Sequence, residues 1–264
     1  MSHAKTSCTA AVLFLASQAA TAIDCTEASR LTGTFGLKLD GRTVNTNQPY
    51  IAVGLAKLGR GNFTLDLTRS EAGIITRETL AGNIKGTGCN IELEGTGSSA
   101  GFKLAGQTSG RAQPILLTEI RSTSPVVASG PMQSAGIKTC SNLSLKGNYI
   151  YLSQGYERSV KPDNSWLAIG KTGRESFDGK GCSVYTETVK TGATVTTIGP
   201  ELLPYSVNTD CSFDLTKAGQ RVVYGILLNG GSNMVYMTLV DGAVRGGEYS
   251  RASGSPKLPG CGTK

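Results

Sequence analysis

Histidine is almost absent from this sequence: the only one among 264 residues is His3. The G-x-G-x-x-G and P-loop motifs of nucleotide sites and the C-x-x-C spacing of zinc or redox sites are absent as well. Since His3 lies in a segment that we expect to be removed, the mature chain has no imidazole for Ser-His-Asp or Cys-His catalysis or for a histidine metal site. The sequence therefore predicts no metal and no cofactor, and it leaves the catalytic residues unassigned.

Long apolar runs are also missing, and none could span a bilayer as a helix. Residues 1–22 instead follow the pattern of a secretory signal peptide. Lys5 precedes a short apolar core at Ala10–Ala16, and Ala20-Thr21-Ala22 is a small-x-small cleavage site. The alternative is a buried N-terminal helix. We expect an exported protein, secreted or extracytoplasmic, without an integral membrane segment.

Charged residues are few, at 17% of the chain, and the formal net charge is +7. The basic residues are scattered, without a Lys/Arg run or interleaved aromatic residues, so we expect no nucleic-acid partner. Carboxylate pairs such as Glu92 with Glu94, or Glu187 with Asp214, remain available for acid–base chemistry. Solvated carboxylates on a strand are far commoner than catalytic pairs, and none is assigned a catalytic role.

The two halves of the chain share an ordered series of matches. In chain order these pair Leu31–Phe35 with Leu145–Tyr149, Ala52–Gly54 with Ala168–Gly170, Gly59–Gly61 with Gly179–Gly181, and Gly82–Cys89 with Pro204–Cys211. A repeat of this length is a duplicated domain rather than a solenoid unit. We expect a first domain at 23–121, a linker at 122–136, which contains Pro125 and Pro131, a second domain at 137–255 and a tail at 256–264.

Both copies have the composition of β structure. Segments such as Asn148–Leu152, Ser183–Val189 and Val222–Leu228 are rich in β-branched and aromatic residues, and Asp-Gly or Asn-Gly turn signals stand at 40–41, 178–179, 229–230 and 241–242. The pattern predicts an all-β, calycin-like fold of two tandem related antiparallel barrels or sandwiches. Along Met234–Val240 both alternating faces are apolar. In one interpretation, the side chains of one face fill the interior of a barrel and those of the other face pack against the sister domain. In the other, the strand is a central strand of a sandwich.

Seven cysteines become six when Cys8 is removed with the signal. An even number in an exported chain favours disulfides. Cys25 and Cys140 open the two copies, while Cys89 and Cys211 hold equivalent positions in the last match. The duplication therefore predicts the pairs Cys25–Cys89, Cys140–Cys211 and Cys182–Cys261. The sequons at Asn62 and Asn142 are candidate glycosylation sites.

Aromatic residues are scarce, at 6% of the chain, but every tyrosine except Tyr50 lies in the second copy. This asymmetry predicts that the second domain, or its contact with the first, holds any binding site. The predicted ligand-binding residues are Trp166, Tyr185, Tyr205, Tyr224 and Tyr236, with Arg221 or Lys171 polarising a carbonyl group. The alternative is that these tyrosines are ordinary strand and core residues.

The order of Leu145–Tyr149, Phe177–Gly181 and Tyr205–Cys211 resembles secreted all-β domains of bacteria and fungi, most of them without assigned function. The two-copy, signal-bearing, disulfide-bonded format is also similar to secreted fungal hetero-Diels–Alderases of tropolone sesquiterpenoid pathways. This resemblance implies a cofactor-free all-β fold that joins a reactive dienophile or quinone methide to a polyene, and it transfers no active-site residue. Such chemistry needs proximity and a dry pocket.

Two classes of function follow. In the first, the exported protein binds an apolar small molecule and catalyses a cofactor-free cyclisation or isomerisation, of which a pericyclase is the specific form. In the second, it is a non-enzymatic extracellular carrier, adhesin or envelope recognition protein. Glycan binding through exposed Tyr and Trp is a third hypothesis, although the two copies share no repeated pattern of aromatic residues. A homodimer is compatible with each of them.

Overall fold

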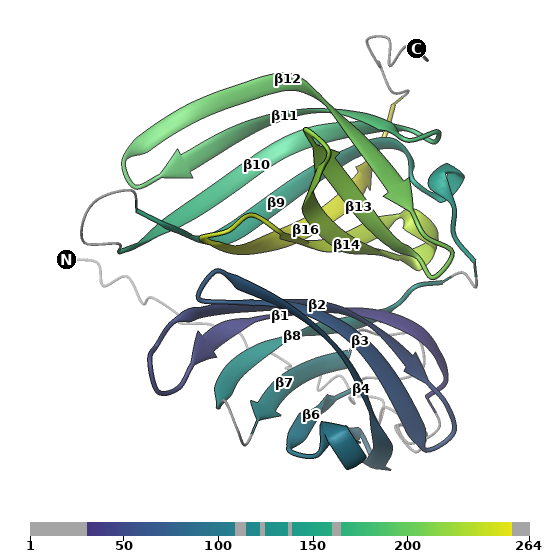
Figure 1. The fold of residues 1–264 in the computed structure, drawn as a ribbon. Coiled ribbons are helices and arrows are strands. Elements are labelled where there is room, and N and C mark those ends of the chain that lie inside the picture. The colour runs from purple at the N-terminus through teal and green to yellow at the C-terminus, as the bar shows by residue number, and fades with distance from the viewer. Residues whose placement is uncertain (1–30, 109–114, 122–124, 137–138, 160–164, 255–264) are drawn as a thin grey trace, which may run out of the picture.

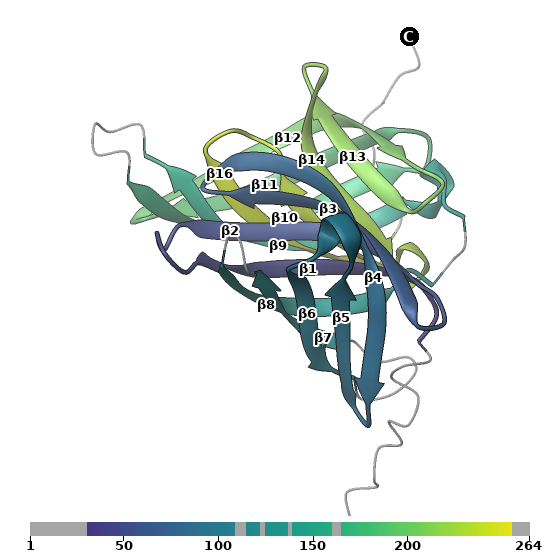
Figure 2. The same ribbon diagram turned by 60° about the horizontal axis from the view of Figure 1, so that its bottom comes forward.

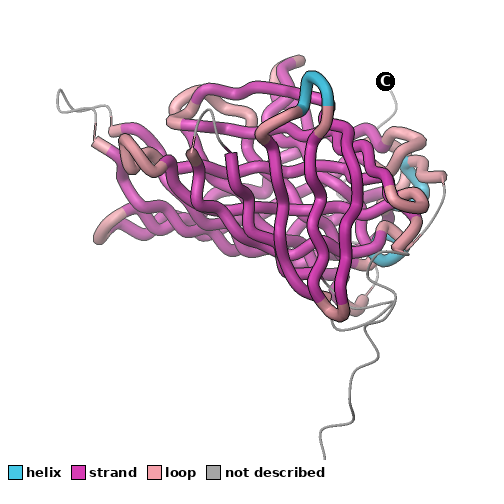
Figure 3. Tube along the Cα trace, turned by 90° about the horizontal axis from the view of Figure 1, so that it is seen from below, coloured by secondary structure: helices cyan, strands magenta, loops and turns pink. Residues whose placement is uncertain are grey.

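The computed structural model describes residues 31–108, 115–121, 125–136, 139–159 and 165–254. These residues form two closed antiparallel barrels of eight strands each, packed on one another (Figures 1 and 3). The prediction of an all-β fold with two tandem barrels is confirmed. The described part of the chain contains no helix with the length and apolar character needed to cross a membrane.

Each barrel is a ring of strands in chain order, with the last strand paired to the first. Barrel 1 comprises β1 (Gly33–Thr43), β2 (Pro49–Leu58), β3 (Asn62–Glu71), β4 (Ile74–Thr87), β5 (Asn90–Gly95), β6 (Phe102–Gln107), β7 (Ile115–Arg121) and β8 (Val126–Ser134). Barrel 2 comprises β9 (Lys146–Arg158), β10 (Trp166–Asp178), β11 (Cys182–Thr191), β12 (Thr194–Val207), β13 (Ser212–Lys217), β14 (Gln220–Leu228), β15 (Asn233–Thr238) and β16 (Ala243–Ala252). Single 3-10 turns lie at Gly97–Ser99, Asn142–Ser144 and Asn229–Gly231.

The interior of barrel 1 is filled by apolar side chains. Strand β3 shows the alternation that produces this core, because Phe63, Leu65 and Leu67 point inward and are buried. The inward side chains of the other strands are mainly Leu, Ile, Phe and Ala and form one continuous cluster with them. Within it, the buried carboxylate of Glu119 accepts a 2.7 Å hydrogen bond from the Tyr50 hydroxyl. Barrel 1 is therefore a packed scaffold.

A second apolar cluster joins the barrels. Strand β2 is buried on both faces because its outer face, at Ile51, Val53 and Leu55, packs against the outer faces of β14 and β15. Figure 2 shows the barrels in contact through this region. On β15, Met234 and Tyr236 belong to the core inside barrel 2 and Val235 and Met237 to the interface. The first interpretation of Met234–Val240, one face inside a barrel and the other against the sister domain, is therefore confirmed.

The predicted linker at 122–136 is wrong. Most of it is β8, which closes barrel 1 by pairing with β1 and β7. Its inward residues Val126, Ala128 and Met132 are buried in the core, and Pro131 is accommodated opposite Leu116. The small residues and prolines hid a strand whose apolar positions alternate. The barrels are instead joined between β8 and β9.

The Asp40-Gly41 pair does not form the predicted turn, since both residues lie within β1. A Cβ atom at Gly41 would lie 2.1 Å from the carbonyl oxygen of Val127 on β8. Glycine is required here because a neighbouring strand approaches closely, which is the second common reason for a glycine in a strand.

The duplication is visible in the strand registers, with one correction. Gly33 and Gly147, which begin the two repeats, have nearly the same φ, 123° and 124°. Gly33 pairs with Leu58, and Gly147 pairs with Phe177. Counted from these pairs, the ladder equivalent of Gly54 is Gly173, three residues after the predicted match at Gly170. The equivalence of the two barrels is therefore set by how their strands pair, and not by the short sequence match of Ala52–Gly54 with Ala168–Gly170.

The predicted disulfide between Cys140 and Cys211 is confirmed, with an S–S distance of 2.07 Å. It ties the segment before β9 to the start of β13 at one end of barrel 2. Cys89 and Cys182 are also disulfide-bonded. The pairings Cys25–Cys89 and Cys182–Cys261 stay predictions, because Cys25 and Cys261 lie outside the described residues.

Replacing Asp178 with Ala should lower the free energy of unfolding by about 1–2 kcal/mol, the usual cost of losing a side-chain cap. Asp178 ends β10, and its Oδ1 accepts hydrogen bonds from the backbone N–H groups of Lys180, Gly181 and Cys182 at 2.7, 2.9 and 3.0 Å. Chemical denaturation of the variant measures the loss. An unchanged midpoint would mean that water satisfies these N–H groups equally well.

Candidate functional site

Side chains of barrel 2 line an open cavity of about 300 Å³. One end of the barrel is closed by packed aromatic side chains, among which Phe177 makes edge-to-face contacts with Tyr149 and Tyr205 at centroid distances of 5.4 and 5.2 Å. Above this floor the inward positions of several strands carry polar side chains. We call the cavity and the side chains that line it the cup.

A carboxylate held by two donors lies in the cup. One oxygen of Glu187 accepts from the Lys171 ammonium group and the other from the Tyr151 hydroxyl, each at 2.8 Å. Tyr151 reaches across β10 at Gly173, where a Cβ atom would lie 2.6 Å from the tyrosine ring. Burial, and then the charge of Glu187, raise the pKa of Tyr151 far above its ordinary range. The phenol therefore stays a donor to a fixed carboxylate.

A second glutamate is buried deeper in the same wall. Glu175 is 2% exposed, and its two oxygens accept hydrogen bonds of 2.6 Å from the Ser183 and Tyr249 hydroxyls. Burial raises the pKa of Glu175 to about 7; the two hydrogen bonds oppose this shift and the charge of Glu187 adds to it. Near neutral pH Glu175 therefore retains a proton in part of the molecules, a property that environments of this kind give to acids in functional sites.

The mouth of the cup carries balanced charges. Glu201 accepts from Tyr185 at 2.8 Å and from Lys217 at 2.7 Å. Arg245 forms an ion pair with Glu157, and burial lowers the pKa of the guanidinium group to about 10. In the described ranges, no three His, Cys, Asp or Glu side chains come together in a way that could hold a metal ion.

An apolar wall faces these polar groups. In the ring of strands, β13 and β14 are four positions from β9 and β10. They contribute Leu215, Val222 and Val223 to the cup, and β12 contributes Leu203. The cup thus combines a charged side with an aliphatic side, an arrangement that suits a small molecule with one polar edge.

Three of the predicted ligand-binding residues line the cup: Lys171, Tyr185 and Tyr236. Tyr205 lies in the floor, where its hydroxyl donates to the carbonyl oxygen of Leu145 at 2.9 Å. Its position fits the alternative that it is a core residue.

The other three predicted residues lie between the barrels or beside them. Trp166 donates from Nε1 to the side-chain oxygen of Gln48 on barrel 1 at 2.5 Å, and Tyr224 belongs to the interface cluster. Arg221 forms an ion pair with Asp214. The structure therefore does not bring these three together with the cup, and Arg221 has no access to a ligand there.

The sequence interpretation missed the acids of the cup. Glu187 was considered only with Asp214, which lies in the ion pair with Arg221, and Glu175 was not considered. The outward residues Glu92 and Glu94 form ordinary surface ion pairs with Lys103 and Lys85. The sequence of β10 did contain a signal. Lys171 and Glu175 lie two residues before and two residues after Gly173, so all three share one face of the strand, the face that lines the cup. Their inward direction becomes clear only once the barrel is closed.

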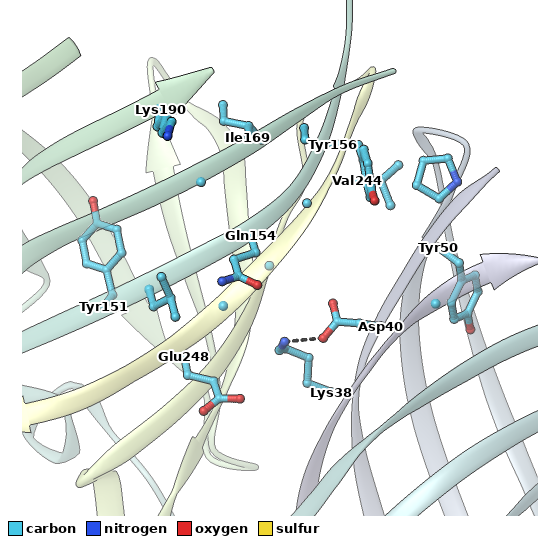
Figure 4. Close-up of a pocket in the computed structure, with 18 of the residues that line it drawn as sticks. Lys38, Asp40, Tyr50, Tyr151, Gln154, Tyr156, Ile169, Lys190, Val244 and Glu248 are labelled. Carbon is cyan, nitrogen blue, oxygen red and sulfur yellow. Dashed lines mark hydrogen bonds and ion pairs between the residues drawn. The ribbon is translucent and has the colours of Figure 1, made fainter. Parts of the chain in front are cut away.

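A wider groove of about 940 Å³ lies between the barrels (Figure 4). Lys38 and Asp40 of β1 form an ion pair on one side of it, and Gln154 and Glu248 face them from barrel 2 in Figure 4. The ring of Tyr151 lies on the far side of the barrel 2 strands from the Lys38–Asp40 pair in the same view. The groove is larger than the cup, but it contains no comparable set of buried, hydrogen-bonded acids among the described residues.

The two sequons differ in their surroundings. Asn62 is exposed at the start of β3. Asn142 is half-buried, and its Oδ1 accepts a 2.8 Å hydrogen bond from the backbone N–H of Val207. Asn62 is thus the better placed of the two candidate glycosylation sites.

No family model matches the chain, and no curated protein matches it in sequence. Among solved structures, it is similar to kievitone hydratase from Nectria haematococca, with 9% identity and a TM-score of 0.26 over 89% of this chain and 94% of that one. It is also similar to a candidate AttH protein from Nitrosomonas europaea, with 8% identity and a TM-score of 0.25 over 83% of this chain and 92% of that one. TM-scores of this size support no inference about activity.

Proposed function

We propose that the cup of barrel 2 binds a small neutral molecule and catalyses its isomerisation or cyclisation by proton transfer, without a cofactor. The observation that carries this proposal is the contrast between the barrels. The inward positions of barrel 1 form an apolar core, whereas those of barrel 2 surround a cavity with lysine, glutamate and tyrosine. Buried ionisable groups around a cavity are costly for stability and are typical of functional sites.

Glu187 is the proposed base. It breaks a C–H or O–H bond of the ligand by accepting the proton, and the electron pair shifts along the ligand. Glu187 then returns a proton at another position, and exchange of the glutamic acid proton with water before this return labels the product in D2O. Lys171 and Tyr151 hold the carboxylate in place, and Glu175, whose pKa is raised by burial, adds less negative charge to the cup near neutral pH than a second ionised glutamate would. One base therefore accounts for both proton transfers, and the product is an isomer of the substrate.

The hetero-Diels–Alder form of this activity is the more specific proposal. The apolar wall of Leu203, Leu215 and Val223 supports it, because a concerted cyclisation needs a dry surface that holds the reactants together. The charged wall favours a step in which a proton moves. Export to an oxidising compartment is also proposed, and the Cys140–Cys211 disulfide supports it.

A blocked cup tests the proposal. We expect Val223→Trp to fill the cavity and abolish ligand binding, measured as thermal shifts against a panel of neutral ketones, phenols and terpenoid alkenes. The matched control is Val195→Trp on an exposed position of β12. Compounds that bind only when the cup is open are then incubated with the protein in D2O, and incorporated deuterium is measured by mass spectrometry.

The outcomes separate the two classes of function. Binding with deuterium incorporation supports the proton-transfer enzyme. Binding without incorporation or turnover supports a carrier instead. If Val223→Trp and Val195→Trp bind the panel equally, the cup is not the site.

A further inference from the structure

One tyrosine of the cup does not share the bonding pattern of its neighbours. Tyr151, Tyr185 and Tyr249 each donate their hydroxyl proton to a glutamate. Tyr236 lies among them, with its ring centroid 4.8 Å from that of Tyr249, and its side chain is only 4% exposed. In the described ranges, no carboxylate or carbonyl oxygen accepts a hydrogen bond from Tyr236.

The polar neighbour of the Tyr236 hydroxyl is Ser153. Ser153 donates its own proton to the carbonyl oxygen of Gly246 at 3.2 Å. With its proton committed to that carbonyl, the Ser153 oxygen remains as an acceptor for Tyr236. This acceptor is neutral, whereas those of the three neighbouring tyrosines are carboxylates. Tyr236 can therefore exchange a neutral acceptor for a ligand oxygen, whereas its neighbours would have to give up a charge-assisted hydrogen bond to a carboxylate.

The surroundings restrict what kind of oxygen this is. Three glutamates and three cations line the cavity. Each cation, Lys171, Lys217 or Arg245, is already paired with a glutamate, so none is left to neutralise an anionic ligand. An alcohol would bring a donor of its own that needs an acceptor, whereas a carbonyl oxygen only accepts. The aliphatic side of the cup, at Leu215 and Val223, adds a preference for an apolar skeleton.

We propose that Tyr236 is the hydrogen-bond donor that binds the ligand's carbonyl oxygen, and that the cup takes neutral, mostly apolar carbonyl compounds. This inference rests on the proposed function of the cup and names its substrate class. Tyr236 also takes the role of polarising the carbonyl group that the sequence predicted for Arg221 or Lys171, because both of these cations are paired with carboxylates.

The chemistry follows from these placements. Glu187 accepts the proton of a C–H bond next to the carbonyl group, and the electron pair of that bond moves toward the carbonyl oxygen to give an enol-like intermediate. Tyr236 donates to this oxygen as its negative charge develops. The proton on Glu187 then forms a new C–H bond at a different carbon. No electrons are gained or lost, and no co-reactant is consumed.

A pair of fluorescent probes tests the assignment. The ketone is 6-propionyl-2-dimethylaminonaphthalene, and its partner is 2-dimethylaminonaphthalene, which lacks the carbonyl group. We expect the wild-type protein to prefer the ketone. Tyr236→Phe should weaken ketone binding roughly fivefold, the equivalent of one hydrogen bond, and leave binding of the partner within about twofold. The carbonyl stretching band of the bound ketone should lie at lower frequency in wild type than in this variant.

The controls keep this test apart from the test of the function itself. Tyr185→Phe removes a cup hydroxyl that already donates to Glu201, so ketone preference should persist, and Ser153→Ala should preserve it as well. Equal weakening of both probes by Tyr236→Phe would reduce Tyr236 to a packing residue and overturn the inference. A cup that binds only panel compounds without a carbonyl group also overturns it, while the proposed function stands. If no compound depends on an open cup, the proposed function itself fails.

Discussion

Glu187→Gln should lower the rate of deuterium incorporation into a bound ligand by about 10²- to 10⁴-fold, the usual contribution of a positioned general base. Glutamine keeps the size of the side chain and an oxygen that can accept from Tyr151, but it cannot take up a proton. Because the cavity keeps its shape, affinity for the ligand should change much less than the rate. The measurement is exchange in D2O under saturating ligand, with the dissociation constant determined in parallel.

Glu201→Gln is the matched control for this result. Glu201 is also a glutamate that accepts from a tyrosine and a lysine, but it lies at the mouth of the cup and is more exposed. Its replacement should leave the exchange rate nearly unchanged. Equal losses in both variants would point to a general effect of charge in the cup, and an active Glu187→Gln protein would exclude Glu187 as the base.

The fold was predictable because its determinants are local or repeated. Turn signals such as Asp178-Gly179 end strands where expected, and the paired positions of Cys89 and Cys211 each precede the fifth strand of a barrel. The two apolar faces of Met234–Val240 indicated two packed surfaces. The errors at Gly41 and at 122–136 have a common cause. Glycine and proline are permitted in a strand where a neighbouring backbone requires or tolerates them, and this depends on tertiary pairing.

The cup was predictable only in its location. Its essential contacts join distant residues: Tyr151 and Glu187 are 36 positions apart, and Glu175 and Tyr249 are 74 positions apart. Alternate side chains of a strand point to opposite faces, and which set points inward depends on how the barrel closes. It also depends on bulges, such as the register shift between Tyr185 and Glu187. Counting tyrosines identified the correct domain, but it could not separate lining residues from floor residues such as Tyr205.

The two barrels share a ladder and differ in their contents. The duplicated Gly54 and Gly173 both lie where a Cβ atom would collide with side chains of the interior. In barrel 1 those side chains are Leu65 and Leu67, and in barrel 2 the side chain is Tyr151. The same backbone therefore supports an apolar core in one copy and a polar cavity in the other. Barrel 2 loses apolar packing by this exchange, which is the cost that a functional site imposes on stability.

Glu175→Gln should stabilise the protein at pH 8 relative to wild type, and have little effect at pH 4.5 or below. The pKa of Glu175 is raised by burial from 4.5 to about 7, so between these values the folded state binds more protons than the unfolded state. The free energy of unfolding of the wild-type protein therefore falls as the pH rises through this range, and it levels off above about 7. The shift corresponds to about 3 kcal/mol, and glutamine removes it because its amide does not titrate.

Denaturation at a series of pH values measures this difference, and two further variants identify its origin. Glu175→Ala should be destabilised at every pH, because the buried Tyr249 hydroxyl loses its acceptor. Ser183 keeps only the longer bond, of 3.2 Å, to the carbonyl oxygen of Leu203. Glu201→Gln should show the opposite trend to Glu175→Gln: the Lys217 and Tyr185 partners lower the pKa of Glu201, so its ionised form favours folding above its ordinary pKa. Parallel curves for wild type and Glu175→Gln from pH 5 to pH 8 would mean that Glu175 is hydrated and ionises normally. In that case Glu175 adds its full negative charge to the wall of the cup near neutral pH, and the separate role of Glu187 loses its electrostatic basis.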